Sequence, residues 1–315
     1  MPTFYFTFFL LCFPMLVQAD EPASIRYLER DGVIETMATG AATPQTPFAI
    51  ASVGKTLTAV AILRLAERGA LELDDPVSRW VDPDISTGFG GLEGITLRHL
   101  LTMTSGLPDY FDDDFLEDAL AAPNAVQDPK TALSYAFPHD RLFAQGTGFD
   151  YSNTNYVLLG LVLEQASGRS YAQAMQFDVL TPAKMRDSFV FGSTPLPANF
   201  PNGHEYGQHF RSYYEATGFG DGGIISTAAD VARFYKALFI EQTLLTPAMM
   251  AEFTQDAMDK DYGMGIEIED STYGHSGGDL GFSADARIDL ETGTIAVILI
   301  AQADADTSWT YDILD

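Results

Sequence analysis

The sequence predicts an α+β fold, in which an antiparallel sheet is flanked by helices and carries an inserted, mainly helical domain. Two observations predict it. Strand-like patterns occur near both ends of the 315-residue chain, and the middle is rich in helical periodicity and turns. Strands from both ends can share one sheet if the middle of the chain forms a separate unit. We therefore assign residues 20–83 and 215–315 to the α+β domain and residues 84–214 to the insertion.

Composition limits the classes of function. Hydrophobic residues make up 46% of the chain and charged residues 19%, which is typical of a packed globular protein and not of a disordered one. The 44 acidic residues against 17 basic ones give a formal net charge of −27. Because so acidic a surface repels phosphate backbones and anionic lipid headgroups, the composition argues against nucleic-acid binding and peripheral membrane binding.

The N-terminus has the features of a targeting segment. Residues 3–17 carry no charge and are too few to span a bilayer comfortably, but they match the apolar part of a signal peptide, although no Lys or Arg precedes them. Val17-Gln18-Ala19 then supplies small residues at the cleavage positions, and Asp20 begins a polar chain. We expect residues 1–19 to be a signal peptide, which leaves a periplasmic or secreted protein with no stable membrane anchor. Cys12, the only cysteine, lies in this segment, so the mature chain would have no disulfide or cysteine-bound metal.

The first elements have clear local signals. Residues 24–38 predict a hairpin, because Asp31-Gly32 is a two-residue turn signal between two strand-like runs. Residues 52–68 show helical spacing, and Gly69 is a stop signal. The apolar stripe of this helix comprises Val53, Leu57, Val60, Ala61 and Leu65.

Later elements follow from the same patterns. Periodicity predicts helices at 97–103, 153–165, 171–179 and 230–239, the last of them capped near Ser226 or Thr227. Alternating or β-branched runs predict strands at 262–268, 281–290 and 294–301, with a tight turn at 291–293 between the last two.

Two familiar sequence motifs are matched in part, but the chain lacks a feature that each of them requires. Gly-Lys-Thr at 54–56 matches the end of a phosphate-binding loop, but Ala49 stands where that loop requires a glycine to curl around phosphate. Gly-His-Ser-Gly-Gly at 274–278 has the letters of a nucleophile elbow, which must lie between a strand and a helix and be followed by an acid and a histidine. Here a strand follows and no histidine comes after His275, so we reject both interpretations.

Ser52 and Lys55 stand at the start of the helix predicted for 52–68. Residues three apart on a helix face the same way, with Cβ atoms about 5–6 Å apart, so the lysine amine can reach the serine oxygen. The helix N-terminus adds a positive field and free N–H groups that suit an oxyanion. The apolar run 48–51 places the pair near the core, where burial would lower the lysine pKa from about 10.4 and free its lone pair. The pair can act as nucleophile and base; the alternative is a capping serine beside a solvated lysine.

Two more segments carry suitable side chains. Tyr151 and Asn153 stand where a loop meets the helix predicted for 153–165. A phenol can relay a proton there and an amide can bind a carbonyl group, although Asn153 could equally be a helix cap. His-Ser-Gly at 275–277 lies in a strand-like region, where glycine allows a substrate backbone to approach an edge.

Together, Ser-Val-Gly-Lys at 52–55, Tyr-Ser-Asn at 151–153 and His-Ser-Gly at 275–277 resemble, in order and separation, the three active-site motifs of the serine β-lactamase and penicillin-binding protein family. The similarity is to the branch of class C β-lactamases, serine D,D-carboxypeptidases and β-lactamase-fold esterases. Residues 100–110 and 222–234 look like further family stretches. The resemblance implies a β-lactamase/transpeptidase-like fold.

The resemblance also implies a role for each catalytic residue. Ser52 would be the acylated nucleophile. Lys55 and Tyr151 would move its proton as a pair, with either of them as the base. Asn153 would hold the substrate's amide carbonyl.

The third motif would bind substrate. The resemblance places the backbone N–H groups of Ser52 and Gly278 in the oxyanion hole, with Gly277 beside them. His275 would take the place of the lysine that most β-lactamases have in this strand. A histidine is largely neutral at pH 7, and no Lys or Arg lies between Asp261 and His275 to supply a charge for a substrate carboxylate.

We therefore expect an exported serine acyl hydrolase that works through a Ser52 acyl-enzyme. A histidine in this motif occurs among D,D-peptidases, so a D,D-carboxypeptidase-like activity on D-amino-acid peptides ranks first. An esterase or amidase ranks second, because the missing cation suits uncharged substrates, and a β-lactamase ranks third. The alternative of another class is a non-catalytic sensor or scaffold that retains the fold, although none of the motifs is broken.

The expected partner is a small-molecule or peptide substrate, with no nucleic acid, no cofactor and no metal. His204 and His209 flank Glu205, but their spacing does not fit one helix face. We expect them at the surface or between the two domains.

Overall fold

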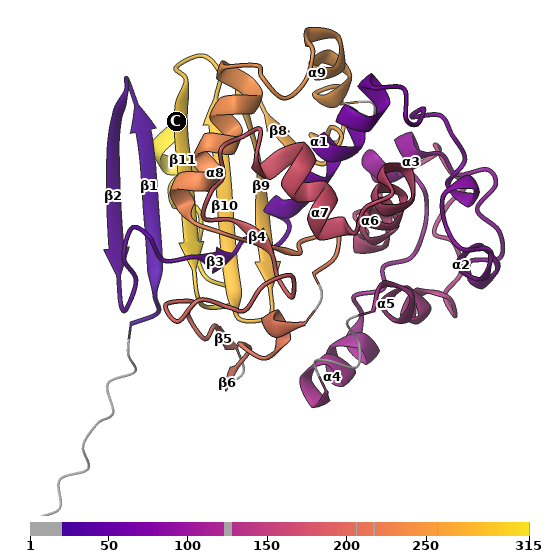
Figure 1. The fold of residues 1–315 in the computed structure, drawn as a ribbon, viewed down its shortest axis with the longest axis horizontal. Helices are drawn as coiled ribbons and strands as arrows, with labels where there is room; N and C mark the ends of the chain where they lie inside the picture. The colour runs from indigo at the N-terminus through magenta and orange to yellow at the C-terminus, as the bar shows by residue number, and fades with distance from the viewer. Residues whose placement is uncertain (1–20, 123–127, 206, 217, 257, 315) are drawn as a thin grey trace, which may run out of the picture.

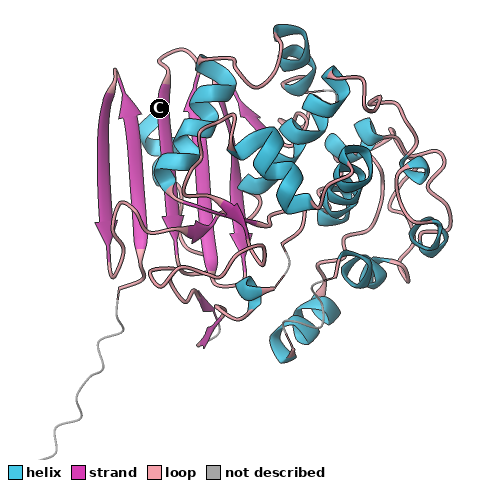
Figure 2. Cartoon of the chain, in the orientation of Figure 1, coloured by secondary structure: helices cyan, strands magenta, loops and turns pink. Residues whose placement is uncertain are grey.

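A six-stranded sheet forms one side of the fold, and all its neighbouring strands run antiparallel (Figure 1, Figure 2). The order β2-β1-β11-β10-β9-β8 brings strands from both ends of the chain together where β1 pairs with β11, which confirms the predicted α+β class. The strands are β1 (Ser24–Arg30), β2 (Val33–Thr39), β8 (Glu267–Glu269), β9 (Thr272–Asp279), β10 (Phe282–Asp289) and β11 (Thr294–Ile300).

The computed structural model describes residues 21–122, 128–205, 207–216, 218–256 and 258–314. The predicted signal peptide, with Cys12, lies outside these residues. Within the described ranges, none of the helices is long and apolar enough to cross a bilayer.

Helices pack on both faces of the sheet. α1 (Val53–Glu67) and α8 (Ala228–Tyr235) contact one face, and α10 (Trp309–Leu314), seen in part beside the C label of Figure 1, contacts β10 and β11 on the other. All eight residues of β10 are buried, because successive side chains point to opposite faces and both faces are covered.

The segment between the two halves of the sheet is mainly helical and lies beside it (Figure 2). Its helices are α2 (Pro83–Gly88), α3 (Leu97–Leu101), α4 (Asp113–Ala121), α5 (Pro129–Ala136), α6 (Asn153–Ser167) and α7 (Tyr171–Met175), and α9 (Pro247–Phe253) follows later. Short helical turns are η1 (Val77–Arg79), η3 (Gln176–Leu180), η4 (Tyr213–Glu215) and η5 (Lys236–Ile240); η3 continues α7 and η5 continues α8 as π-helical turns.

A second, three-stranded sheet leads to the predicted nucleophile. It has the order β3-β7-β4, with β3 (Phe48–Ala49), β7 (Ile224–Ser226) and β4 (Phe189–Val190). β4 falls within the segment 84–214 that the sequence assigns to the insertion, yet it pairs with β7. A two-stranded hairpin of β5 (His204–Glu205) and β6 (Gln208–His209) places both histidines at the surface, with ring centroids 4.6 Å apart. Among the described residues, no three His, Cys, Asp or Glu side chains gather in a way that could hold a metal ion.

Several local predictions are confirmed. β1 and β2 form the predicted hairpin, with Asp31 at φ 53° and Gly32 at φ 75° in its turn. Thr227 caps α8 by accepting a hydrogen bond from the Asp230 N–H. The helix after Ser52 is α1, which is buried on most sides and not along one stripe, because α6 as well as the sheet packs against it.

The predicted strand at 262–268 is wrong over most of its length. β8 begins only at Glu267, and the Gly263 N–H donates to the Ile266 carbonyl to close a tight turn before it. The apolar residue Tyr262 at the start of this pattern is needed for tertiary packing in the site and not for a strand. The Tyr262 ring packs edge-on against Tyr151 and His275.

Candidate active site

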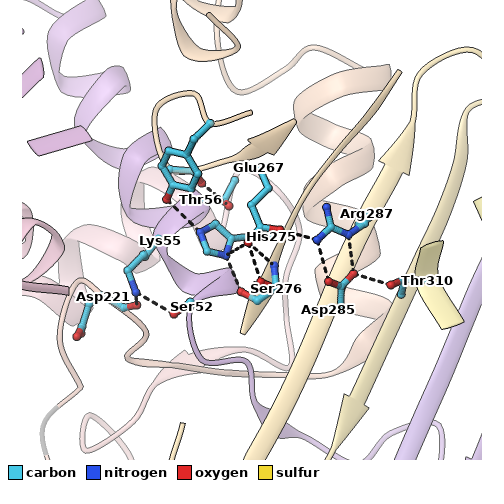
Figure 3. A network of polar contacts seen from close by, with 12 residues as sticks. Ser52, Lys55, Thr56, Asp221, Glu267, His275, Ser276, Asp285, Arg287 and Thr310 are labelled. Carbon is cyan, nitrogen blue, oxygen red and sulfur yellow. Dashed lines mark hydrogen bonds and ion pairs between the residues drawn. The ribbon is translucent and has the colours of Figure 1, made fainter. Parts of the chain in front are cut away.

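Ser52 lies where β3 ends and α1 begins. Ala51 has a left-handed φ of 46°, an uncommon conformation for a residue with a Cβ, and Ser52 follows at φ −62° as the first residue of the turn into the helix. The Ser52 side chain makes no capping hydrogen bond. The capping interpretation of this serine is therefore wrong, and its Oγ is directed to Lys55 instead (Figure 3).

Lys55 is fully buried, which excludes the solvated interpretation. Its Nζ donates to Ser52 Oγ at 2.9 Å, to Asn153 Oδ1 at 2.7 Å and to the Asp221 carbonyl oxygen at 2.7 Å. These contacts come from α1, α6 and the loop before β7. The structure thus joins two of the predicted motifs through one amine.

Asn153 is the first residue of α6, and Ser152 is the helix cap position. Its Nδ2 donates to Asp109 Oδ2 at 2.8 Å, and its backbone N–H donates to Asp109 Oδ1 at 3.0 Å. Asp109 therefore fixes which way the amide points, with the oxygen toward Lys55. Sequence reasoning missed Asp109, although it lies in the family-like stretch 100–110.

Tyr151 lies beside this pair with 37% of its surface exposed. Lys55 Nζ is 5.0 Å from the centre of its ring. Although part of the ring is exposed, desolvation of the hydroxyl in the site raises the pKa of Tyr151, and the Lys55 charge and hydrogen bonds with Lys55 and Ser52 act to lower it. The resting site therefore holds a protonated phenol, which is a proton donor.

His275 lies on β9 and is 1% exposed. Burial lowers the pKa of His275, and the nearby Glu267 carboxylate does not restore it, so the ring is neutral at pH 7. Nδ1 is 2.5 Å from the Ser276 carbonyl oxygen and Nε2 is 3.1 Å from the Tyr262 hydroxyl. Burial also raises the pKa of Tyr262, so its phenol donates to Nε2 while Nδ1–H donates to the carbonyl. Both ring nitrogens are engaged within the protein, which does not support the direct substrate contact that the resemblance implies.

Gly277 and Gly278 lie on an open edge of β9. β8 pairs with β9 only as far as Gly274, so the edge beyond it faces the site. A Cβ at Gly277 would lie 2.9 Å from the Ile50 carbonyl oxygen and 3.0 Å from the Ser52 nitrogen, so only glycine fits. The Ser276 N–H points to the open edge, where it donates to Glu267. Because N–H directions alternate along a strand, the Gly278 N–H points there too, beside the Ser52 N–H.

A pocket of about 540 Å³ opens beside Ser52. It is lined by Ser52, Tyr151, Asn153 and the open edge of β9. The lining also includes four acidic residues, whereas no Lys or Arg appears among the described residues that form it. The acidic residues are Asp221, Glu267, Asp279 and Asp304.

Asp279 gives the pocket a group that titrates near neutrality. Burial raises the pKa of Asp279 to about 7, and the neighbouring Asp221 adds to the shift. A carboxyl group whose pKa is raised by folding binds more protons in the folded than in the unfolded state between about pH 4 and pH 7. Stability is therefore lost as the pH rises through that window.

Asp279→Asn should remove this loss. We expect the variant to match the wild type at pH 4 and to exceed it by about 4 kcal/mol at pH 8, because the amide carries no charge to bury. Urea unfolding at the two pH values measures the difference. An equal difference between variant and wild type at both pH values would contradict the assignment.

Comparisons with known proteins agree with this geometry. The protein-family model described as Beta-lactamase matches residues 18–314. The chain is 30% identical over 292 residues to penicillin-binding protein 4* of Bacillus subtilis, which covers 85% of this chain and 63% of that protein. It is 38% identical over 147 residues to protein flp of Staphylococcus aureus, covering 46% of this chain and 28% of that one. The chain thus spans less than two thirds of the length of these relatives.

Solved structures show the same fold. The penicillin-binding protein from Bacillus halodurans has a TM-score of 0.78 and 29% identity, with 92% of this chain and 93% of that chain covered. The D-stereospecific amidohydrolase from Streptomyces sp. has a TM-score of 0.80 and 26% identity, with 93% of both chains covered. The expected fold is confirmed. Because the family model matches nearly the whole chain, the chain belongs to the β-lactamase family and has the β-lactamase/penicillin-binding fold.

Proposed function

We propose that the chain is an exported serine amidase, which hydrolyses amides or short peptides of D-amino acids through a Ser52 acyl-enzyme. One observation carries this choice over a D,D-carboxypeptidase. The pocket beside Ser52 has four acidic residues and no Lys or Arg among the described residues of its lining, and its histidine is neutral and enclosed. A D,D-carboxypeptidase must bind a substrate that ends in a carboxylate, which these charges disfavour.

The contacts around Ser52 support the chemistry. The reactive form of the enzyme is the one in which Lys55 has released a proton: Ser52 Oγ attacks the amide carbonyl carbon as its own proton passes to the Lys55 Nζ that contacts it. The N–H groups of Ser52 and Gly278 stabilise the oxyanion of the tetrahedral intermediate. The C–N bond then breaks, and the leaving amine receives a proton from the Tyr151 phenol, which regains one from Lys55. Water hydrolyses the acyl-enzyme by the reverse proton transfers.

Two further points support the proposal. The Streptomyces neighbour is named as D-stereospecific, which supports the D configuration of the substrate. The features of residues 1–19 support export to the periplasm or the medium. A D,D-carboxypeptidase-like activity stays the second candidate, because two similar proteins are named penicillin-binding proteins.

A side-by-side assay of the purified full chain separates the candidates. The substrates are D-phenylalanine amide, its L enantiomer, a p-nitrophenyl ester, a peptide ending in D-Ala-D-Ala and a chromogenic cephalosporin. We expect hydrolysis of the D-amide and the ester, with an acyl adduct on Ser52 by intact mass. Preference for the D-Ala-D-Ala peptide would establish the carboxypeptidase instead, and the absence of any Ser52 adduct would favour a non-catalytic scaffold.

A further inference from the structure

Glu267 is a pocket residue that none of the catalytic steps uses. It lies on β8 with 26% of its side chain exposed, opposite the open edge of β9. Its Oε1 accepts hydrogen bonds from Ser276 Oγ at 2.6 Å and from the Ser276 N–H at 3.2 Å. Its Oε2 accepts one from Arg287 Nη2 at 2.5 Å. Each carboxylate oxygen is thus held by a donor.

These donors together make a site for a carboxylate. A hydroxyl, a backbone N–H and a guanidinium converge on one anionic group, which is the donor set that proteins use to recognise carboxylates. We call the Ser276 N–H, the Ser276 hydroxyl and the Arg287 guanidinium the carboxylate site. His275 Nδ1 lies 3.5 Å from the same Glu267 oxygen that Ser276 contacts.

The Arg287 guanidinium is also held in place by residues other than Glu267 (Figure 3). Arg287 is 1% exposed, and its Nε and Nη2 both donate to Asp285 at 3.0 Å. Asp285 in turn accepts a hydrogen bond from Thr310 Oγ1 of α10 at 2.7 Å. The guanidinium therefore keeps its place whether or not Glu267 is present.

The register of the sheet explains how Glu267, a residue of β8, reaches the guanidinium of Arg287. Gly274 of β9 stands opposite Glu267 on one side and opposite Arg287 on the other. A Cβ at Gly274 would lie 2.6 Å from Arg287 Cγ, so only glycine lets the Arg287 side chain cross β9 to reach Glu267. Burial acts to raise the pKa of Glu267, but His275, Arg287 and the hydrogen bonds from Ser276 and Arg287 outweigh it, so Glu267 is ionised.

We infer that Glu267 is the specificity-determining residue of the pocket: it fills the carboxylate site with a carboxylate of the chain itself and so excludes substrates that carry one there. The inference rests on the proposed function and explains its preference for substrates without a carboxylate. A substrate carboxylate would meet donors that are already engaged and a like charge in front of them. Removal of Glu267 should open the site to such substrates.

The test compares three variants of the full chain. Glu267→Ala empties the carboxylate site, Glu267→Gln keeps the shape without the charge, and Glu269→Ala is the control, an exposed glutamate two residues along the same strand. The first readout is Tm in sodium acetate against sodium chloride at equal ionic strength. The second is the rate of Ser52 labelling by a fluorescent penicillin, which carries a carboxylate, divided by the rate of hydrolysis of a neutral p-nitrophenyl ester.

We expect acetate to refill the emptied site. It should raise Tm of Glu267→Ala by about 2–5 °C while leaving the wild type and Glu269→Ala unchanged. The labelling ratio should rise by about tenfold or more in Glu267→Ala, because a charge-assisted pair becomes available to the substrate. Added acetate should suppress that gain by competition. Glu267→Gln should raise the ratio by a smaller factor, since it removes only the repulsion.

Two outcomes would overturn the inference. The first is a folded Glu267→Ala variant with no acetate-dependent Tm shift and no rise in the labelling ratio. The second applies if Glu267→Ala does not fold: a labelling ratio of Glu267→Gln that equals that of the wild type would then contradict the inference. The acetate measurement needs no activity, so a wild type that hydrolyses none of the substrates would count against the proposed function and leave the carboxylate site to be judged by the Tm shift.

Discussion

Ser52→Ala should abolish covalent labelling of the chain by a fluorophosphonate and lower amide hydrolysis by about 10⁵-fold or more. The reason is that Ser52 Oγ is the atom that would carry the acyl group, and it is the hydroxyl that Lys55 contacts at 2.9 Å. Without it the pocket and the oxyanion donors remain, but no acyl-enzyme can form. Intact mass of the labelled protein and steady-state kinetics on D-phenylalanine amide measure the two effects.

The fold of the Ser52→Ala variant should be retained. Ser52 makes no capping hydrogen bond, so the substitution removes only its contacts with Lys55 and Tyr151, at a cost of about 1 kcal/mol. Ser134→Ala is a suitable control, because Ser134 is exposed on α5 and does not line the pocket. Persistent labelling of Ser52→Ala at another residue would disprove the assignment of the nucleophile.

Asp285→Ala should destabilise the fold far more than Ser52→Ala does. Asp285 and Arg287 are both buried, so removing the carboxylate leaves an arginine that keeps only Glu267 as an anionic partner among the described residues. Breaking a buried ion pair in this way costs about 3–5 kcal/mol, which corresponds to a fall in Tm of about 10 °C for a chain of this size. Urea unfolding and thermal unfolding at pH 8 measure it.

Thr310→Val distinguishes the contribution of the Asp285–Arg287 ion pair to stability from that of the docking of α10. It removes the 2.7 Å hydrogen bond from the Thr310 hydroxyl to Asp285 and the 3.0 Å contact of the same hydroxyl with the Thr307 carbonyl oxygen, and it keeps the shape of the side chain, so we expect a loss of about 1 kcal/mol. A loss in Thr310→Val as large as that in Asp285→Ala would mean that the docking of α10, and not the charge pair, stabilises this side of the sheet.

Those elements of the fold that depend on local signals could be predicted from the sequence. The Asp31-Gly32 turn needs two residues at positive φ, and both adopt it. Ser52 and Lys55 lie one helical turn apart, so their contact follows from helix geometry alone. The strand predicted at 262–268 is wrong because the pattern of alternation says nothing about where the Tyr262 ring packs.

The surroundings of His275 could not be predicted in this way. The stretch from Asp261 to His275 has no Lys or Arg, which suggests a site without a cation. Arg287 nevertheless approaches it from the next strand, because β10 pairs with β9 in a register that sets Arg287 opposite Gly274. The same register brings Glu267 to the other side of Gly274. The sequence alone therefore could not show that these two charged residues lie beside His275, because the strand register brings them there.

Features whose geometry is set within a few residues can be read from the chain alone: the hairpin turn, the helix that carries Ser52 and Lys55, and the glycines of the third motif. Three others emerge only once the chain is folded. Lys55 is buried against Asn153, His275 has both ring nitrogens engaged, and Glu267 occupies the donors beside it. Helix and turn contacts follow from bonded geometry, whereas strand register and burial are set by the packing of the whole sheet.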